Sequence, residues 1–152
     1  MLPTPVKFTL VAGSAEGPTP LNAFDNALLV AGVGNLNLVK VSSILPPGAT
    51  FTDRLEIPPG SLTPIAYGCR TSESKGELIS AAVAVGLSDE GFGVIMEFSG
   101  EGSAREAEDH VLGMVREAFK SRGSECRRTL VKSVEHRVSD IGCAFAAVAL
   151  WY

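Results

Sequence analysis

Two adjacent serines, Ser42 and Ser43, stand between an apolar segment and the rigid Pro46-Pro47 pair. A peptide bond placed between a strand and a proline turn can be held under strain. The side-chain amides of Asn35 and Asn37, a few residues upstream, are able to donate to a carbonyl oxygen. This grouping therefore allows chemistry at a backbone carbonyl. The plainer interpretation is that the hydroxyls cap the end of a strand, and the serine pair alone favours it.

The other reactive side chains fit no common catalytic or metal-binding pattern. His110 and His136 lie far apart in the sequence, so no metal site is predicted. The small-residue loop at 13–17 precedes a helix, but it lacks both common phosphate-binding glycine patterns. The chain also has no G-x-S-x-G elbow, the usual signature of a serine nucleophile in hydrolases.

The elements that must position these residues are strands interrupted by two helices. Thr19-Pro20 predicts the start of one helix, and Ser103 with Glu106 forms a capping box at the start of the other. Residues 46–60 are rich in proline and glycine and are predicted to be loop. Short turns suit antiparallel pairing, so the sequence predicts one α+β domain with a helix covering a sheet face. Strands are predicted near residues 6–12, 36–41, 62–69, 78–87, 93–98, 129–138 and 142–152.

The composition narrows the class of protein. Apolar residues make up 45% of the 152 residues and charged residues 20%, which excludes a disordered chain. The net charge of −4 argues against a nucleic-acid binder and is compatible with a cationic small ligand. The apolar runs are too short to span a bilayer. Three cysteines without C-x-x-C spacing, and no signal-peptide pattern, predict a reducing, cytoplasmic location.

Six short segments of the chain occur in the same order in a known family. They are Leu21-Asn22-Ala23-Phe24-Asp25, Gly32 to Leu38, Val41 to Pro47, Ala66-Tyr67-Gly68, Gly93 to Phe98, and Gly142 to Ala147 with the terminal Trp151-Tyr152. From about residue 6 to its last residue the chain resembles the pyruvoyl-dependent arginine decarboxylases. The resemblance implies an αββα sandwich of mainly antiparallel strands with covering helices. It also implies homotrimers with active sites at the subunit interfaces.

The resemblance further implies a precursor that cuts itself between Ser42 and Ser43. Residues 1–42 would become a small β chain and residues 43–152 a large α chain. The Ser43 hydroxyl would attack the Ser42 carbonyl to give an ester, elimination would leave dehydroalanine, and hydrolysis would release ammonia. Position 43 would then carry a pyruvoyl group (pyruvic acid), the covalent cofactor. Asn37 matches the family's asparagine for this step, in which a donor must stabilise the developing oxyanion.

The activity implied by the resemblance is the decarboxylation of L-arginine to agmatine and carbon dioxide, in polyamine synthesis. The pyruvoyl carbonyl would condense with the substrate amine and draw electrons as carbon dioxide leaves. Glu97 matches the family's proton donor, and its apolar neighbours would disfavour the ionised carboxylate. Asp25 matches the position that faces the guanidinium, where a carboxylate can accept paired hydrogen bonds. Ser43, Ile44 and the segment 32–34 would line the rest of the pocket.

Several alternatives stay open on the sequence alone. The same cofactor could act on another amino acid, or an uncleaved homologue could serve as a ligand-binding or assembly module. A serine hydrolase that uses Ser43 directly is a third alternative. Strand alternation could also turn Glu97 outward, since its same-face neighbours Ile95 and Ser99 do not decide the matter. If the resemblance holds, Glu97 and Ser43 are expected to reach one pocket from neighbouring protomers or from facing strands.

Overall fold

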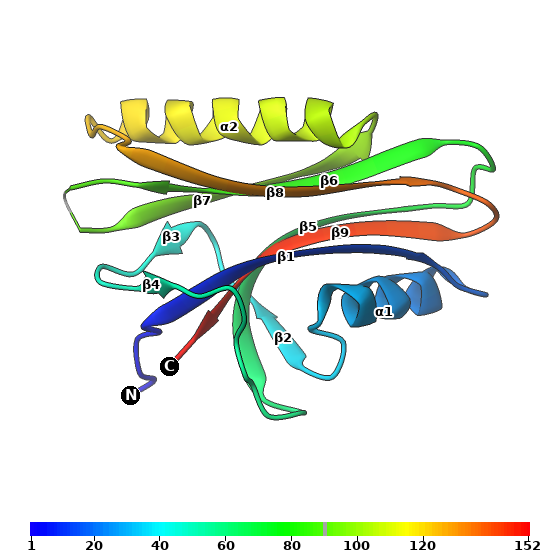
Figure 1. Ribbon diagram of the computed structural model, residues 1–152, viewed down its shortest axis with the longest axis horizontal. Helices are drawn as coiled ribbons and strands as arrows, with labels where there is room; N and C mark the ends of the chain where they lie inside the picture. Colours follow the sequence, from blue (N-terminus) through cyan, green and yellow to red (C-terminus); the bar gives the residue numbers. More distant parts are fainter. Residues whose placement is uncertain (90) are drawn as a thin grey trace.

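The computed structural model describes residues 1–89 and 91–152. Two β-sheets pack face to face, and each carries one helix on its outer face (Figure 1). Helix α1 (Pro20–Ala31) covers one sheet and helix α2 (Ala104–Ser121) covers the other. This arrangement confirms the predicted α+β sandwich of αββα type.

The sheet under α1 has the strand order β2-β5-β9-β1-β4, and the sheet under α2 has the order β3-β7-β6-β8. Most neighbouring strands are antiparallel; β2 with β5 and β1 with β4 are parallel. The strands of the first sheet are β1 (Lys7–Glu16), β2 (Asn37–Lys40), β4 (Thr50–Phe51), β5 (Leu62–Ser72) and β9 (Gly142–Trp151). Those of the second are β3 (Ile44–Leu45), β6 (Leu78–Leu87), β7 (Gly93–Glu101) and β8 (Arg128–Arg137).

The central strands of both sheets have no polar face. Strands β6 and β9 are buried along nearly their whole length and are rich in alanine and valine. Each of them has a helix on one side and the opposite sheet on the other, so both faces must be apolar. Small side chains also let the layers approach closely. The sequence signal at these strands is therefore a continuous apolar run rather than an alternating pattern.

The predicted helix boundaries are confirmed by their caps. The Thr19 hydroxyl accepts a hydrogen bond from the backbone of Asn22, and Gly32 ends α1 in the left-handed region with a φ of 86°. At the start of α2, Ser103 and Glu106 exchange both hydrogen bonds of the capping box. These short-range signals can be read from the sequence because each depends on residues only three positions apart.

Two predictions of loop are wrong in part. The segment 13–16 continues strand β1, because β9 pairs with it as far as Gly142. Gly13 is required there, since a Cβ atom would lie 2.6 Å from the carbonyl oxygen of Ala27 in α1. Within the predicted loop 46–60, Thr50 and Phe51 form the short strand β4 beside β1. Both differences come from pairing with distant segments, which local sequence does not reveal.

The chain crosses from one sheet to the other between residues 40 and 44. Before the crossing, the N–H of Val41 donates to the carbonyl of Ile65 in β5 at 2.9 Å. After it, the carbonyl of Ser43 accepts from the N–H of Ile95 in β7 at 2.7 Å. The Ser42–Ser43 bond thus lies in a short connection held at one end by each sheet.

Candidate active site

Ser43 is fixed beside the first residues of strand β7. Its carbonyl is bound by Ile95, and the next two residues, Ile44 and Leu45, pair with Val94 and Gly93. Ser43 is half-buried, whereas Ser42 and Ile44 are exposed. The serine that would carry the reaction therefore lies at an accessible edge of the second sheet, with its backbone held.

Glu97 lies on the same strand and faces the space between the two sheets. Ile95, two residues earlier on this face, is buried in the core between the sheets. Two residues later, the hydroxyl of Ser99 donates to the carbonyl of Cys69 in β5 at 3.0 Å. Glu97 is therefore turned inward at the edge of the sandwich, and the alternative of an outward side chain is wrong. Ser43 and Glu97 stand on adjoining segments of one sheet in one chain.

The surroundings of Glu97 are not apolar, in contrast to the expectation from its sequence neighbours. Nζ of Lys40 lies 3.1 Å from Oε1 of Glu97, and the Glu97 side chain is 29% exposed. The same ammonium stands over the ring of Tyr67, 4.6 Å from its centroid. The structure thus pairs Glu97 with a cation where desolvation by apolar residues was predicted.

Strand β5 comes unusually close to β7 beside this pair. A Cβ atom on Gly68 would lie 3.2 Å from the carbonyl oxygen of Phe98, so the glycine permits the approach. The thiol of the neighbouring Cys69 lies close enough to be affected by both charges. Burial raises its pKa most, the charge of Lys40 lowers it, and the charge of Glu97 raises it. Lys40, Tyr67 and Cys69 were missed by sequence reasoning, because nothing local links them to Glu97.

The predicted strain at the Ser42–Ser43 bond does not show in the backbone angles. Among the described residues only glycines have a positive φ, and every peptide bond is trans. Neither serine therefore occupies the left-handed region that would store conformational energy. What the structure provides at this bond is anchoring on both sides, by Ile65 and Ile95.

Asn37 and Asp25 lie apart from Ser43 within one chain. Asn37 begins β2, and its side-chain amide donates to the carbonyl of Gly60 at 2.8 Å. It precedes Ser42 by an extended stretch of roughly 16 Å. Asp25 is exposed on α1, next to Phe24, whose ring lies 6.3 Å from that of Tyr67. Of the predicted site residues, Ser42, Ser43, Ile44 and Glu97 lie on adjoining segments at the second sheet, whereas Asn37 lies on β2 and Asp25 on α1.

The segment 32–34 faces a different hollow. An open cavity of about 920 Å³ lies between the end of α1 and the loop 53–59, and 32–34 line it. Neither Ser43 nor Glu97 belongs to its lining. The predicted lining residues fall into two groups on separate parts of the chain.

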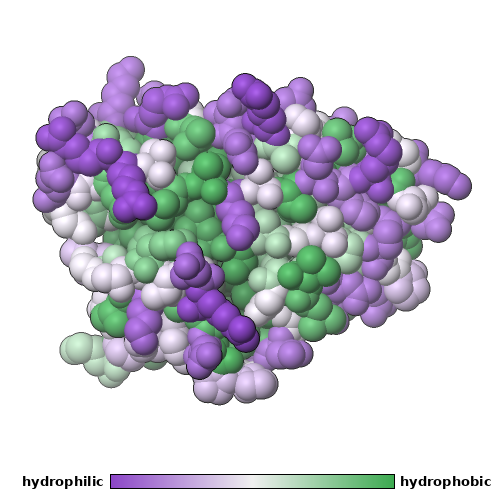
Figure 2. Space-filling view, in the orientation of Figure 1, coloured by the Kyte–Doolittle hydropathy of each residue, from purple (hydrophilic) through white to green (hydrophobic). Residues whose placement is uncertain are grey.

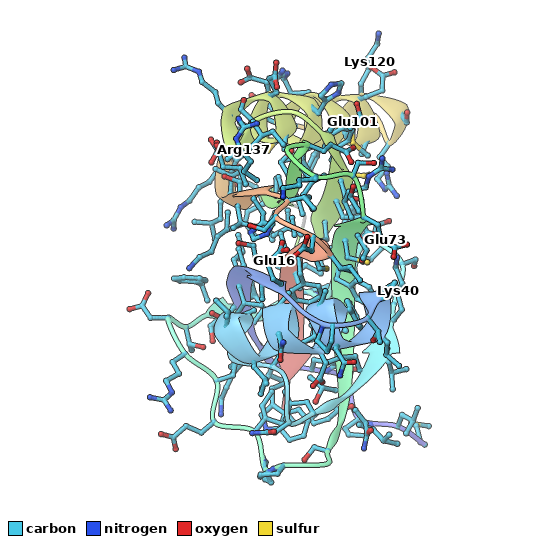
Figure 3. The ribbon with its side chains drawn as sticks, turned by 90° about the vertical axis from the view of Figure 1, so that its right-hand side faces the viewer. Glu16, Lys40, Glu73, Glu101, Lys120 and Arg137 are labelled. Carbon is cyan, nitrogen blue, oxygen red and sulfur yellow. The ribbon has the colours of Figure 1, made fainter. Side chains whose placement is uncertain are left out.

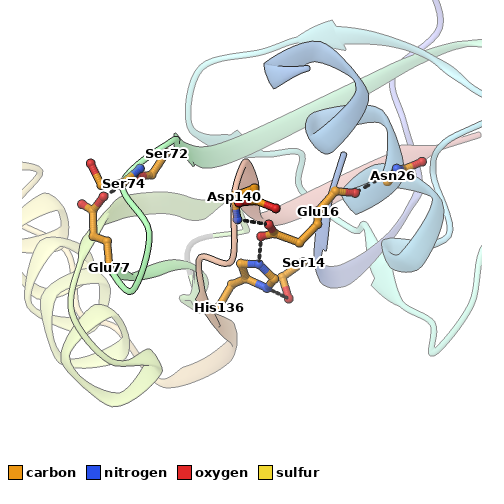
Figure 4. A network of polar contacts seen from close by, with 8 residues as sticks. All are labelled: Ser14, Glu16, Asn26, Ser72, Ser74, Glu77, His136 and Asp140. Atoms are coloured by element: carbon orange, nitrogen blue, oxygen red, sulfur yellow. Dashed lines mark hydrogen bonds and ion pairs between the residues drawn. The ribbon is translucent and has the colours of Figure 1, made fainter. Parts of the chain in front are cut away.

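A second polar network lies at the opposite edge of the sandwich (Figure 4). There the ring of His136 in β8 contacts Glu16 and Ser14 in β1, at 2.5 and 3.2 Å. Glu16 also accepts from the N–H of Asp140 at 2.8 Å, and its backbone carbonyl accepts from Asn26. Near this network, Glu77 and Ser72 form a short hydrogen bond. All these groups are engaged with one another rather than with an open pocket.

The described residues contain no cluster of three or more metal-ligating side chains. No helix in the described part of the chain is long and apolar enough to cross a bilayer. The three cysteines are all free thiols in the structure. Burial raises the pKa of Cys143 to about 11, which keeps that thiol protonated and inert at neutral pH.

Comparison with known proteins gives a consistent result along nearly the whole chain. The family model described as pyruvoyl-dependent arginine decarboxylase matches residues 7–152. A protein of that name from Methanocaldococcus jannaschii is 51% identical over 150 residues, covering 97% of this chain and 91% of the relative. Those from Pyrococcus abyssi and Methanothermobacter thermautotrophicus are 45% and 44% identical, covering 98% and 94% of this chain and 96% and 95% of each relative. The chain belongs to the pyruvoyl-dependent arginine decarboxylase family.

Proposed function

We propose that this protein decarboxylates L-arginine to agmatine and carbon dioxide, in the cytoplasm, as a step of polyamine synthesis. The observation that carries the proposal is the placement of Ser43 and Glu97 together at one edge of the second sheet, in a chain of this family. Ser43 is the source of an electron-withdrawing group, and Glu97 is an acid two residues along β7 from Ile95, the residue that binds Ser43. This pair supplies the two functions that an amino-acid decarboxylase needs.

The first step is cleavage of the chain itself. The hydroxyl of Ser43 attacks the carbonyl carbon of Ser42, the C–N bond breaks, and an ester forms. Elimination frees the carboxylate of Ser42, and hydrolysis expels ammonia from position 43. The anchors on either side, Ile65 and Ile95, support this role because they hold Val41, just before the reacting bond, and Ser43, just after it, while the connection opens.

The residues around position 43 fit a pyruvoyl group. The backbone carbonyl of position 43 accepts from the N–H of Ile95, and the position lies at an accessible edge of the sheet. Glu97 lies on β7, the strand that also carries Ile95. The group supplies an electron sink for the carbon–carbon bond that breaks. Glu97 holds the proton that the substrate carbon receives, Ile44 borders the substrate, and Asp25 accepts hydrogen bonds from the guanidinium.

The two products of cleavage would stay together as one αβ protomer. Every regular element of residues 1–42 belongs to the first sheet or to the helix on it. Strand β1 pairs with β9 over its whole length, and β2 pairs with β5. These hydrogen bonds and the buried face of α1 hold the small chain without a covalent link.

The complete site would form between chains of a homotrimer. Asn37, Asp25 and the segment 32–34 lie on other elements than Ser43, and a neighbouring chain would bring their counterparts to it. Apolar side chains reach the surface among polar ones (Figure 2), as expected of a chain that buries part of its surface on assembly. Those exposed on or beside the first sheet include Leu21, Leu29, Val30, Val39, Phe51 and Leu62.

Intact mass under denaturing conditions tests the cleavage, and an assay of carbon dioxide release tests the activity. The wild-type protein is expected to give two fragments, 1–42 and 43–152, and to release carbon dioxide from L-arginine faster than from ornithine, lysine or histidine. Ser43→Ala should stay full-length and lack activity, while Ser121→Ala on α2 should behave as wild type. A wild-type chain that remains intact would contradict the proposal and favour the alternative of an uncleaved ligand-binding or assembly module.

Co-expression tests the shared site. Glu97→Gln and Asn37→Ala chains should each be inactive alone. Mixed trimers contain sites with Ser43 and Glu97 from one chain and Asn37 from the other, so they should recover part of the activity. Monomers in solution, or no recovery in the mixture, would contradict the trimeric site.

A further inference from the structure

Lys40 is held in two ways at the edge where β2 ends. Its ammonium binds Oε1 of Glu97 at 3.1 Å and covers the ring of Tyr67, while its backbone pairs with Ile65. Figure 3 shows Lys40 at the side of the molecule beside β2, far from Lys120 on α2. A lysine side chain on a surface normally keeps much rotamer freedom, so two partners for one ammonium indicate a defined place.

We propose that Lys40 is a positioning residue for the decarboxylation: by binding Oε1 of Glu97 it leaves Oε2 as the oxygen that carries the proton to the substrate. The inference rests on the proposed function, because it gives Glu97 the role of proton donor. Lys40 precedes the proposed cut and Glu97 follows it, so the contact joins the two chains of one protomer at the site.

The charged groups around Glu97 support this assignment. The cations and acids of β5 and β7 nearest to the pair are already engaged: Arg70 binds Glu77 and Glu101 at 3.4 and 3.5 Å. The Cys69 thiol is protonated at neutral pH, because burial raises its pKa. Strands β3 and β6 present no ionisable side chain to this place.

Helix α2 lies on the other face of β7, where its His110 stacks on Phe98. It therefore contributes no charge on the face that carries Glu97. Among the described residues, Lys40 is the cation that meets this carboxyl.

The position of the proton matters because two carbons compete for it after carbon dioxide leaves. Delivery to the substrate carbon would give, after hydrolysis, agmatine and the restored cofactor. Delivery to the cofactor carbon gives, after hydrolysis, an aldehyde from the substrate and an alanine at position 43. In that second route the substrate carbon is oxidised by two electrons and the cofactor carbon is reduced by two, with the amine nitrogen passing to position 43. The alanine-ended chain has a free amino group and the pyruvoyl chain has none, so N-terminal sequencing separates them.

The test compares Lys40→Met, Lys40→Arg and the distant control Lys120→Met, each as the purified, cleaved protein. Lys40→Met is expected to lose about tenfold in kcat with KM for arginine nearly unchanged, because the proton is held less accurately. Its α chain should also gain alanine at position 43 with fewer turnovers. Lys40→Arg keeps a cation that can donate to Oε1 and should restore most of both properties. Lys120→Met should match wild type.

A second pair of variants decides the case if Lys40→Met does not cleave. Tyr67→Leu removes the ring under the ammonium, and Tyr67→Phe keeps it. The first should lower kcat and raise the formation of alanine, and the second should do neither.

Wild-type values of kcat and alanine formation in Lys40→Met, or in Tyr67→Leu where Lys40→Met does not cleave, would overturn the role of Lys40. A wild-type protein that neither cleaves nor decarboxylates arginine would instead overturn the proposed function, so the two failures are distinct.

Discussion

Two carboxylates bridge the sheets of this sandwich at opposite edges, and their surroundings differ. Glu97 in β7 meets Lys40 from β2, whereas Glu16 in β1 meets His136 from β8. The Glu16 carboxylate also accepts from the N–H of Asp140. In the described part of the chain, Lys40 is the one ion-pair or hydrogen-bond partner of the Glu97 carboxyl.

This difference separates a structural carboxylate from one that is available for chemistry. Both carboxylate oxygens of Glu16 have a partner, His136 at one and the backbone N–H of Asp140 at the other, so a change in its protonation disturbs contacts that hold the fold. The Glu97 carboxyl is held through one oxygen by Lys40, whose side chain is 53% exposed, and its second oxygen is left for a substrate. A proton donor must exchange partners during the reaction, and only the Ser43 side of the molecule allows it.

The largest expected effect sharpens this comparison directly. Glu97→Gln should still cleave but lose about 100-fold or more in kcat, because the amide cannot deliver the proton. Glu16→Gln should keep kcat, since its network contacts no reacting group. Steady-state decarboxylation assays on both cleaved variants measure the difference. Equal losses of kcat in the two variants would contradict the contrast between Glu97 and Glu16. Normal turnover in Glu97→Gln would contradict the role of Glu97 as proton donor.

Substrate binding gives the next effect. Asp25→Asn should raise KM for arginine by about tenfold, because a charge-assisted pair with the guanidinium becomes neutral. Its kcat should change little. Asp109→Asn on α2 is the matched control, an exposed helical aspartate on the other layer. Identical KM values for the wild type and Asp25→Asn would clear Asp25 of guanidinium binding.

The sequence predicts the elements whose signals lie within a few residues, but it does not reveal contacts between segments that are distant in the chain. Thr19, Ser103 and Gly32 mark helix ends within three or four residues, and the structure has the caps where they were predicted. Strands β3 and β4 are two residues long and exist only because β7 and β1 lie beside them. No pattern in either segment could have shown them.

The candidate site divides in the same way. Ser43 and Glu97 were predicted from the family resemblance, and the structure brings them to one strand pair. They were expected on neighbouring protomers or facing strands, but they belong to adjoining segments of one sheet. Lys40 could not be assigned from its own segment, because its partner Glu97 is reached only after the chain has crossed between the sheets.

Two glycines allow the close approaches at the two edges, and alanine at each should have separate consequences. At Gly68 a Cβ would press on backbone atoms of Phe98 at 3.2 and 3.3 Å, so β5 must move from β7. Gly68→Ala should lower kcat several-fold, since Tyr67 on β5 supports the Lys40–Glu97 pair.

At Gly142 a Cβ would lie 2.4 Å from Oε2 of Glu16 and 2.7 Å from the ring of His136. Gly142→Ala should therefore lower the free energy of unfolding by about 1–3 kcal/mol and leave kcat unchanged. Thermal unfolding and decarboxylation measured on both variants check the pattern. Loss of kcat in Gly142→Ala with unchanged stability would contradict a purely structural role for the edge that carries Glu16.

The smallest expected effect is the pH dependence of the Glu16 network. Burial raises the pKa of Glu16, but hydrogen bonds from Asp140, His136 and Ser139 and the charge of His136 outweigh it and lower the pKa below its ordinary value of 4.5. A carboxyl whose pKa is lowered by folding stabilises the native state above its unfolded pKa, and this contribution is lost as pH falls through the folded value.

Wild type should therefore exceed Glu16→Gln in stability above about pH 4.5, by about 1 kcal/mol or less because the Glu16 side chain is one-third exposed. Below that pH the difference should shrink. Urea unfolding across the range measures it, with Glu117→Gln on α2 as the background for losing one carboxylate. A difference that grows toward acid would mean that the network favours the protonated form of Glu16, and the edge opposite Ser43 would then have to be considered for proton chemistry of its own.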